Sequence, residues 1–309
     1  MASHLFSPID LNALRLDNRI VVAPMCQYSA RRGNMTDWHV MHLGQYAVSG
    51  AGLVFIEATA VEAAGRITPN CVGLYSDENE AAMARVLRFL RDYGNSRIGI
   101  QLAHAGRKAS THRPWRGGGS LSAAEGAWET WSASDLPFDD SWHQPQALDD
   151  EGLARVKAAF VQATERALRL GIDVVELHVA HGYLLHQFLS PLSNRRGDAY
   201  GGSLEGRMRF PLEVFEAVRA VWPGERPLGV RLSASDWVAG GWDLEGSIAF
   251  VAALQERGCD FVDVSSGGLS PAQQIPVGPG YQVALGAEIR RATQAKVMTV
   301  GLITDPRQA

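Results

Sequence analysis

The 309-residue sequence has little cysteine and no excess of basic residues. Its three cysteines are too few for a disulfide framework, which indicates a reduced protein that we expect in the cytoplasm. The 29 basic residues are outnumbered by 33 acidic ones, so we expect no nucleic-acid partner. No apolar run reaches about 18 residues and the start lacks a charged leader followed by an apolar run, so we predict neither a membrane span nor secretion.

Seven short runs rich in apolar and β-branched residues recur along the chain. Most are continuously apolar instead of alternating with polar residues, as in strands of a parallel sheet that are buried on both faces. The length suits one large domain, and we predict a single domain over residues 1–309. The runs are residues 19–23, 53–58, 98–102, 174–178, 228–232, 261–265 and 296–300.

Helical patterns separate these runs. Leu153, Val156 and Phe160 begin a series of apolar residues at steps of three or four, which predicts one buried face of a helix. Asp149 or Asp150 suits its N-cap and Gly171 its end. A repeat of strands and helices predicts a parallel sheet with helical crossovers. Similar patterns occupy residues 83–90 and 248–254.

Two parallel architectures fit this repeat, an open doubly wound sheet and a (β/α)8 TIM barrel. The chain has neither the glycine-rich dinucleotide fingerprint nor a P-loop, and its polar candidates gather at the predicted carboxyl ends of strands. We therefore predict the barrel, with an N-terminal hairpin over residues 5–16 that plugs its lower end. The connection at about 104–148 lacks a long helical period and holds several tryptophans, so we predict an inserted capping loop.

The pattern His178-x-x-His181-x-Tyr183 follows the fourth predicted strand. It suits a buried structural pair, a metal site, or two imidazoles that stabilise charge on one substrate oxygen. No acidic or cysteine ligand stands at a companion spacing, so we expect no metal. Tyr183 could deliver a proton in the same pocket.

Three further residues at predicted strand ends could carry chemistry. Arg231 ends an apolar strand, so it needs either a structural salt bridge or a ligand with an anion or carbonyl. The planar amide of Gln101 matches the edge of an imide or lactam, although a backbone partner would also satisfy it. Cys26 could be a nucleophile or a small buried hydrophobe. We interpret Lys108 and Lys296 as surface lysines.

Five separated motifs, in this order, resemble the old yellow enzyme family of FMN-dependent ene-reductases. The agreement is closest to bacterial xenobiotic reductases and thermophilic-like NADPH dehydrogenases, in which a cysteine follows the first strand. The resemblance runs almost end to end. The motifs are Pro24-Met25-Cys26-Gln27-Tyr28, Gly65-Arg66-Ile67-Thr68-Pro69, Gln101-Leu102-Ala103-His104-Ala105-Gly106-Arg107-Lys108, and the segments 178–183 and 198–210.

The resemblance implies FMN over the barrel mouth and NADPH or NADH as the reductant. Gln101 would pair with the pyrimidine edge of the flavin, and Arg231 would lie by N1 and the C2 carbonyl, where a cation stabilises the reduced form. Cys26 would tune the flavin potential, and Gly301 would offer a backbone N–H to the phosphate. The backbone that lines the flavin would belong to Ala23, Pro24, Met25, Cys26 and Ala58.

The same resemblance implies reduction of the C=C bond of activated alkenes, such as α,β-unsaturated aldehydes and ketones. His178 and His181 would hold the substrate carbonyl, Tyr28 would contact the same oxygen, and Tyr183 would protonate Cα after hydride leaves flavin N5 for Cβ. Phenols would bind as inhibitors, and family members are commonly dimers or tetramers, so we expect a homo-oligomer.

The chain departs from the family's pattern at its end. Relatives continue with an eighth strand and a Gly-Arg pair that clamps the phosphate, whereas this sequence stops eight residues after Gly301. We therefore expect a chain truncated after the seventh strand, without the eighth βα unit. This motivates one alternative, a flavin-binding barrel remnant that does not turn over. Another is a different barrel enzyme, either a dihydroorotate-type flavoprotein or an aldolase, although no lysine suits an aldolase.

Overall fold

Seven parallel strands form the central sheet, and the computed structural model describes residues 3–309. Their order in space is β11-β10-β9-β8-β5-β4-β3, and every neighbouring pair is parallel. Each predicted run overlaps one of these strands, so the parallel sheet is confirmed. The strands are β3 (Val21–Val22), β4 (Leu53–Ala60), β5 (Arg97–Ala103), β8 (Val174–Val179), β9 (Leu228–Ser233), β10 (Phe261–Ser265) and β11 (Val297–Thr299).

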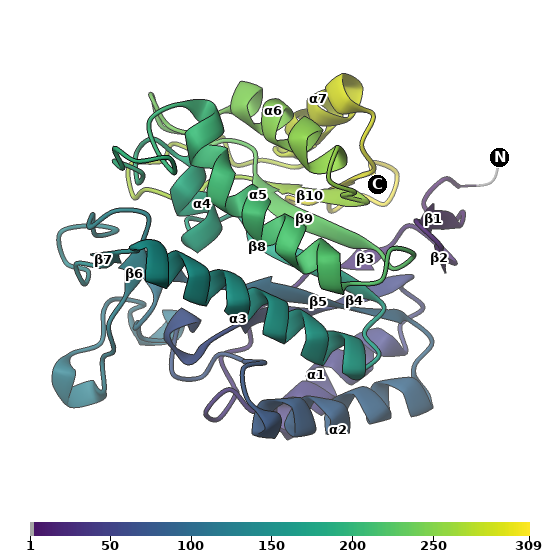
Figure 1. Ribbon diagram of the computed structural model, residues 1–309. Coiled ribbons are helices and arrows are strands. Elements are labelled where there is room, and N and C mark those ends of the chain that lie inside the picture. The colour runs from purple at the N-terminus through teal and green to yellow at the C-terminus, as the bar shows by residue number, and fades with distance from the viewer. Residues whose placement is uncertain (1–2) are drawn as a thin grey trace.

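Helices connect successive strands of the sheet and cover it. Figure 1, coloured from the N-terminus to the C-terminus, shows strands and helices alternating along the chain. The helix predicted after residue 149 is α3, where the Asp149 carboxylate accepts the Gly152 N–H at 2.8 Å. Gly171 follows it with a φ of +68°, as a helix end of this kind requires. The helices are α1 (Asp37–Ala47), α2 (Asp77–Tyr93), α3 (Asp150–Arg169), α4 (Leu184–Leu189), α5 (Leu204–Val221), α6 (Leu244–Gln255) and α7 (Val283–Thr293).

The amino ends of the strands enclose a small apolar cluster that is separate from the main core. Two glycines make room for it: a Cβ on Gly99 would lie 2.5 Å from the Phe55 ring, and one on Gly229 would lie 2.6 Å from the Phe261 ring. The predicted hairpin is present as β1 (Ile9–Leu11) and β2 (Leu14–Leu16), and its leucines pack into this cluster. The hairpin therefore closes the lower end of the sheet, as expected.

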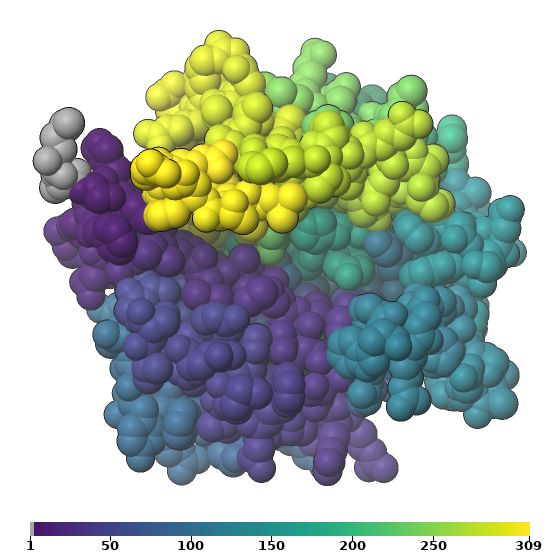
Figure 2. Space-filling model, turned by 180° about the vertical axis from the view of Figure 1, so that it is seen from behind, coloured from purple at the N-terminus to yellow at the C-terminus, as the bar shows by residue number. Residues whose placement is uncertain are grey.

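The sheet curves but does not close on itself within the described residues. Strands β3 and β11 are its two edges, and a hollow of about 520 Å³, lined by Val21, Val297 and Met298 among others, lies between them. Figure 2 shows the furrow between the yellow C-terminal and the purple N-terminal segments. The TIM-barrel prediction is thus confirmed for the curved parallel sheet. Residues 3–309 form a half-barrel, because the edges of seven strands do not meet.

The long connection after β5 contains no α-helix. It has three single-turn 3-10 helices, η2 (Gly106–Lys108), η3 (Pro114–Arg116) and η4 (Ala123–Glu125), and two short strands, β6 (Trp131–Ser132) and β7 (Gln146–Ala147). Its first turn is fastened to distant backbone: the Arg107 guanidinium donates to Leu136 O, Pro137 O and Leu269 O at 3.2, 3.0 and 2.9 Å. The connection is therefore ordered against the segment that follows β10.

Candidate active site

The strand register brings three of the predicted site residues to one region of the sheet. His178 on β8 is the partner of Arg231 on β9, and Gln101 on β5 is the partner of Glu176 on β8. Side chains two residues apart on a strand face the same side, so Glu176 and His178 share one face. The predicted residues therefore form a cluster at the carboxyl half of the sheet.

His178 and His181 contact each other at the end of β8. The Nδ1 atom of His181 lies 3.3 Å from Nε2 of His178, and the two ring planes are inclined at 82°. His178 Nδ1 accepts the Ala180 N–H at 3.2 Å, which places the His178 proton on Nε2. His181 Nε2 lies 2.7 Å from Ser265 Oγ. His181 has a φ of +59°, so its ring orientation depends on a left-handed backbone.

Both imidazoles are held neutral. Burial lowers the pKa of His178, and the neighbouring His181 and Arg231 lower it further. Burial also lowers the pKa of His181, together with the charges of Arg231 and Lys108. A neutral imidazole has one N–H that donates and one nitrogen that accepts, so the pair brings hydrogen-bonding groups without charge to this end of the sheet.

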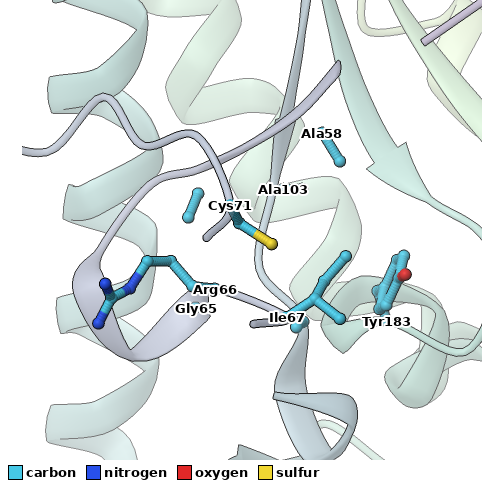
Figure 3. A pocket seen from close by; sticks show the side chains of 9 residues that line it. Ala58, Gly65, Arg66, Ile67, Cys71, Ala103 and Tyr183 are labelled. Atoms are coloured by element: carbon cyan, nitrogen blue, oxygen red, sulfur yellow. The ribbon is translucent and has the colours of Figure 1, made fainter. Parts of the chain in front are cut away.

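Tyr183 packs against this pair and borders a hollow. Its ring centroid lies 4.8 Å from that of His178 in an edge-to-face arrangement. Burial raises the pKa of Tyr183 well above its ordinary value, which keeps the phenol protonated. The hollow has a cavity volume of about 10 Å³, and Figure 3 shows the ring near Ile67 on one side of it. Ala58, a predicted cofactor-binding residue, lines the same hollow.

Lys108 was expected at the surface, and the structure corrects this. Its Nζ donates to His181 O at 3.0 Å and to Gly268 O at 2.8 Å, and lies 5.4 Å from the centre of the Tyr183 ring. Burial lowers the pKa of Lys108 to about 8, and the charge of Arg107 contributes. The sequence could not show this, because the carbonyls that hold Lys108 follow two other strands.

Cys26 and Tyr28 lie in the irregular stretch after β3. Burial raises the pKa of Cys26, and the negative charge of Glu57 raises it further. The thiol is therefore protonated, which argues against the nucleophile and agrees with a small, partly buried group. Tyr28 has a φ of +48° and packs its ring edge-to-face on Trp115 of the long connection. In the same stretch, Ala23 and Pro24 are half-buried and Met25 is exposed.

Arg231 makes the ion pair that was one of its two interpretations. Its Nε atom lies 3.3 Å from Asp263 Oδ2, and both side chains are buried. Between residues 3 and 309 the guanidinium makes no hydrogen bond, so its donors are not satisfied by this contact. Glu176 accepts from Gln101 at 2.8 Å, which leaves the Gln101 amide oxygen without a protein partner in the described chain. Asp263 and Glu176 are site residues that sequence reasoning missed.

These free groups fit a flavin. The pyrimidine edge of a flavin alternates carbonyl oxygens with an N–H, which suits the donor and acceptor of Gln101 and the donors of Arg231. Gly301 follows β11 with a φ of +122°, and its N–H donates no hydrogen bond within the described residues. Such an N–H can bind a phosphate oxygen, although Gly301 lies against Tyr281 and Gln282.

A buried His–Asp contact under the site was also missed. His186 Nε2 lies 2.9 Å from Asp236 Oδ1, and both side chains are inaccessible to solvent. His186 Nδ1 accepts the Gly182 N–H at 2.9 Å, and thereby fixes the residue that follows His181. Its signal in the sequence is weak, because Asp236 lies 50 positions after His186.

The fold and site together define a class of protein. A curved parallel α/β sheet carries, at its carboxyl half, two neutral imidazoles, a phenol, and free polar groups that match a flavin. This combination defines a flavin-dependent oxidoreductase of the barrel type.

Comparisons with known proteins specify the family. The model of the NADH:flavin oxidoreductase / NADH oxidase family matches residues 4–309. The chain is 42% identical over 311 residues to an NADPH dehydrogenase of Bacillus subtilis, covering 100% of this chain and 86% of that protein. It is 41% identical over 313 residues to NADH:flavin oxidoreductase FG08077 of Gibberella zeae, covering 96% and 76%. The chain belongs to this family, the old yellow enzyme family, and is an FMN-dependent NAD(P)H oxidoreductase.

Solved structures agree with this assignment. Morphinone reductase superposes with a TM-score of 0.82 at 28% identity, over 99% of this chain and 81% of that one. The old yellow enzyme homologue from Zymomonas mobilis has a TM-score of 0.79 at 26% identity, over 97% and 82%. Among the described helices, none has the length and apolar character needed to cross a membrane.

Proposed function

We propose that this protein reduces the C=C bond of activated alkenes, such as α,β-unsaturated aldehydes and ketones, with NADPH or NADH as the reductant. The observation that carries the proposal is the packing of the Tyr183 ring, whose phenol is protonated, on His178 of the neutral His178–His181 pair. Two neutral donors and one weak acid are what the reduction of a conjugated carbonyl compound requires.

FMN, when bound, accepts hydride from the nicotinamide and supplies it to the alkene. We assign its pyrimidine edge to Gln101 and Arg231, and its phosphate to the backbone N–H of Gly301. The stretch from Ala23 to Cys26 and the backbone at Ala58 would line it. The support for this is the set of free polar groups on Gln101, Arg231 and Gly301.

The histidines would hold the substrate through its carbonyl oxygen. Their N–H groups withdraw electrons from the conjugated double bond and make its Cβ electrophilic, and Tyr28 would contact the same oxygen. Since this arrangement also binds the oxygen of a phenol, we propose that phenols inhibit the protein. The long connection at 104–148 would cover the site, because Tyr28 already packs on its Trp115.

Tyr183 would deliver the proton to Cα from its hydroxyl. Once that proton leaves, the ring carries a negative charge, and the Lys108 ammonium at 5.4 Å from the ring centre would stabilise it. The same ammonium binds His181 O and so links the proton donor to the carbonyl donors. Lys108 thus adds a residue to the predicted site.

The experiment compares the two half-reactions of FMN-loaded Tyr183→Phe with those of the unaltered protein in anaerobic stopped flow. We expect flavin reduction by NADPH to be unchanged, and reoxidation by cyclohexenone to slow by about 10²–10⁴-fold because the proton donor is gone. Equal reoxidation rates would refute the role of Tyr183. A protein that retains FMN but is not reoxidised by any enone would support the alternative, a flavin-binding remnant.

A further inference from the structure

A layer of polar side chains lies inside the curved sheet, between the apolar cluster and the histidines. Gln101 on β5 is the register partner of Glu176 on β8, and Asp263 on β10 is the partner of Arg231 on β9. Glu176 lies two residues after Val174, which belongs to the apolar cluster, and two before His178. The layer therefore lies directly beneath the candidate active site.

Glu176 is the most constrained member of this layer. Its side chain is 0% exposed, its Oε1 accepts from Gln101 Nε2 at 2.8 Å, and its Oε2 has no hydrogen-bond partner in the described residues. Burial raises the pKa of Glu176 to about 8, and the charge of Asp263 also raises it, while Arg231 and Gln101 act in the opposite direction. The carboxyl group is therefore neutral at pH 7.

The ion pair explains why Glu176 differs from Asp263. The layer holds two acids and one arginine, and Arg231 contacts Asp263 at 3.3 Å. A second buried carboxylate would lack a cation of its own, and an unpaired buried charge costs several kcal/mol, so protonation is the favourable state. Glu176 is left as a neutral acid whose only protein partner within 3–309 is Gln101.

This contact fixes the orientation of the Gln101 amide. The NH₂ group donates to Glu176 Oε1, so Oε1 is the carbonyl oxygen of the neutral acid and the acid's proton lies on Oε2. One amide N–H and the amide oxygen then remain for a ligand. An amide that is held in one of its two orientations presents a defined donor and acceptor, which a freely turning side chain does not.

We propose that Glu176, as a neutral carboxylic acid, is a positioning residue that orients Gln101 for the pyrimidine edge of FMN. The inference rests on the assignment of Gln101 to FMN under the proposed function. It extends the cofactor site by one residue that does not itself need to contact the flavin.

A double-mutant cycle on FMN affinity tests this. The dissociation constant is measured by flavin fluorescence for the unaltered protein, Glu176→Ala, Gln101→Ala and the double variant. We expect each single variant to bind about fivefold more weakly, and the double variant to bind no more weakly than Gln101→Ala. Glu176→Gln, which keeps a neutral acceptor of the same shape, should restore affinity to within about twofold. Additive losses in the double variant, or a Glu176→Gln protein as weak as Glu176→Ala, would overturn the proposal.

The midpoint potential of the bound flavin gives a readout that a purely structural role would not change. The groups that face Glu176 are Gln101, Arg231 and Asp263; burial also raises the pKa of Asp263, while the charge of Arg231 lowers it, and the pKa of Glu176 is raised to about 8. We expect the unaltered protein and Glu176→Gln to have equal potentials at pH 7. Above about pH 8, ionised Glu176 disfavours the added electrons, so the midpoint potential of the unaltered protein should fall below that of Glu176→Gln. A difference at pH 7 as large as at pH 9 would mean that Glu176 is already ionised, and would refute its neutral state.

These measurements need no alkene, so they separate the two proposals. If the FMN cycle and the potentials behave as expected while no enone is reduced, the proposed function fails and the role of Glu176 stands. If enones are reduced but the losses of FMN affinity in the cycle are additive, the proposed function stands and the role of Glu176 fails. Should Glu176→Ala not fold, the Glu176→Gln affinity and potentials still decide the matter.

Discussion

Asp236 is a buried carboxylate whose replacement by asparagine should damage both stability and substrate binding. It accepts from Ser190 Oγ at 2.6 Å and from the Trp242 N–H at 2.7 Å, and it contacts His186 Nε2 at 2.9 Å. Asparagine has the same shape but replaces one acceptor oxygen with a donor. At least one of these three donors would then face an NH₂ group. His186 cannot adapt by moving its proton to Nδ1, because Nδ1 accepts the Gly182 N–H.

The magnitude follows from the number of groups left unpaired. A buried donor without a partner costs about 1–3 kcal/mol, and more where the acceptor that it loses carried a charge. For Asp236→Asn we expect the free energy of unfolding to fall by about 3 kcal/mol. Since Gly182 adjoins His181, whose φ is +59°, the KM for an enone should also rise.

The pH dependence has a definite sign. Burial alone would raise the pKa of Asp236, but His186, Ser190 and the Trp242 N–H lower it below its ordinary value. A carboxyl with a lowered pKa stabilises the fold above its unfolded pKa, and loses that contribution as the pH falls through its folded value. Asp236→Asn should therefore lose more stability at pH 7 than near pH 3.

Urea denaturation of the FMN-loaded protein at pH 7 and near pH 3 measures the loss of stability. Enone kinetics at pH 7 measure the change in KM. Asp92→Asn, at an exposed position of α2, is the matched control and should change stability by less than about 0.5 kcal/mol. A loss below about 1 kcal/mol for Asp236→Asn with an unchanged KM would refute the reasoning, because the buried contacts would then carry no energy.

Two further predictions concern packing and protonation. Gly229→Ala should lower the free energy of unfolding by about 1–3 kcal/mol, because the new Cβ would lie 2.6 Å from Phe261. Gly197→Ala, which has open space around it, should leave the free energy of unfolding unchanged. Equal urea midpoints for the two variants would contradict this prediction. The rate at which enone reoxidises the reduced protein should fall above about pH 8, because Lys108 then loses the proton that stabilises ionised Tyr183. In Lys108→Met the reoxidation rate should be lower and should not change over that pH range. A fall in rate that persists in Lys108→Met would exclude Lys108 as its cause.

The strands were predictable because parallel strands buried on both faces form continuous apolar runs. Helices α1, α4, α5 and α7 were not predicted from the sequence. In α1 the side chains of Trp38 and Met41 are 48% and 50% exposed, so its apolar residues do not mark one buried face. All six residues of α4 are buried, and a segment without a polar face shows no helical period.

The site was predictable where chemistry is local in sequence, as in the pattern from His178 to Tyr183. The partners of Arg231 and Gln101 depend on strand register, which brings together Asp263 and Glu176 from other strands. Because side chains alternate along a strand, the sequence could have shown that Glu176 faces the same side as His178. It could not have shown that Glu176 lies beside Gln101, which is on another strand. Lys108 was misplaced because its environment comes from distant segments.

The proposed function requires this chain to pass reducing equivalents from NAD(P)H to an activated alkene. The most direct test is an anaerobic titration of the FMN-loaded 309-residue chain, followed by its visible flavin absorbance. We expect NADPH to bleach the flavin and cyclohexenone to restore the absorbance, with one equivalent of saturated ketone formed. A flavin that NADPH does not bleach, or that cyclohexenone does not reoxidise, would contradict it.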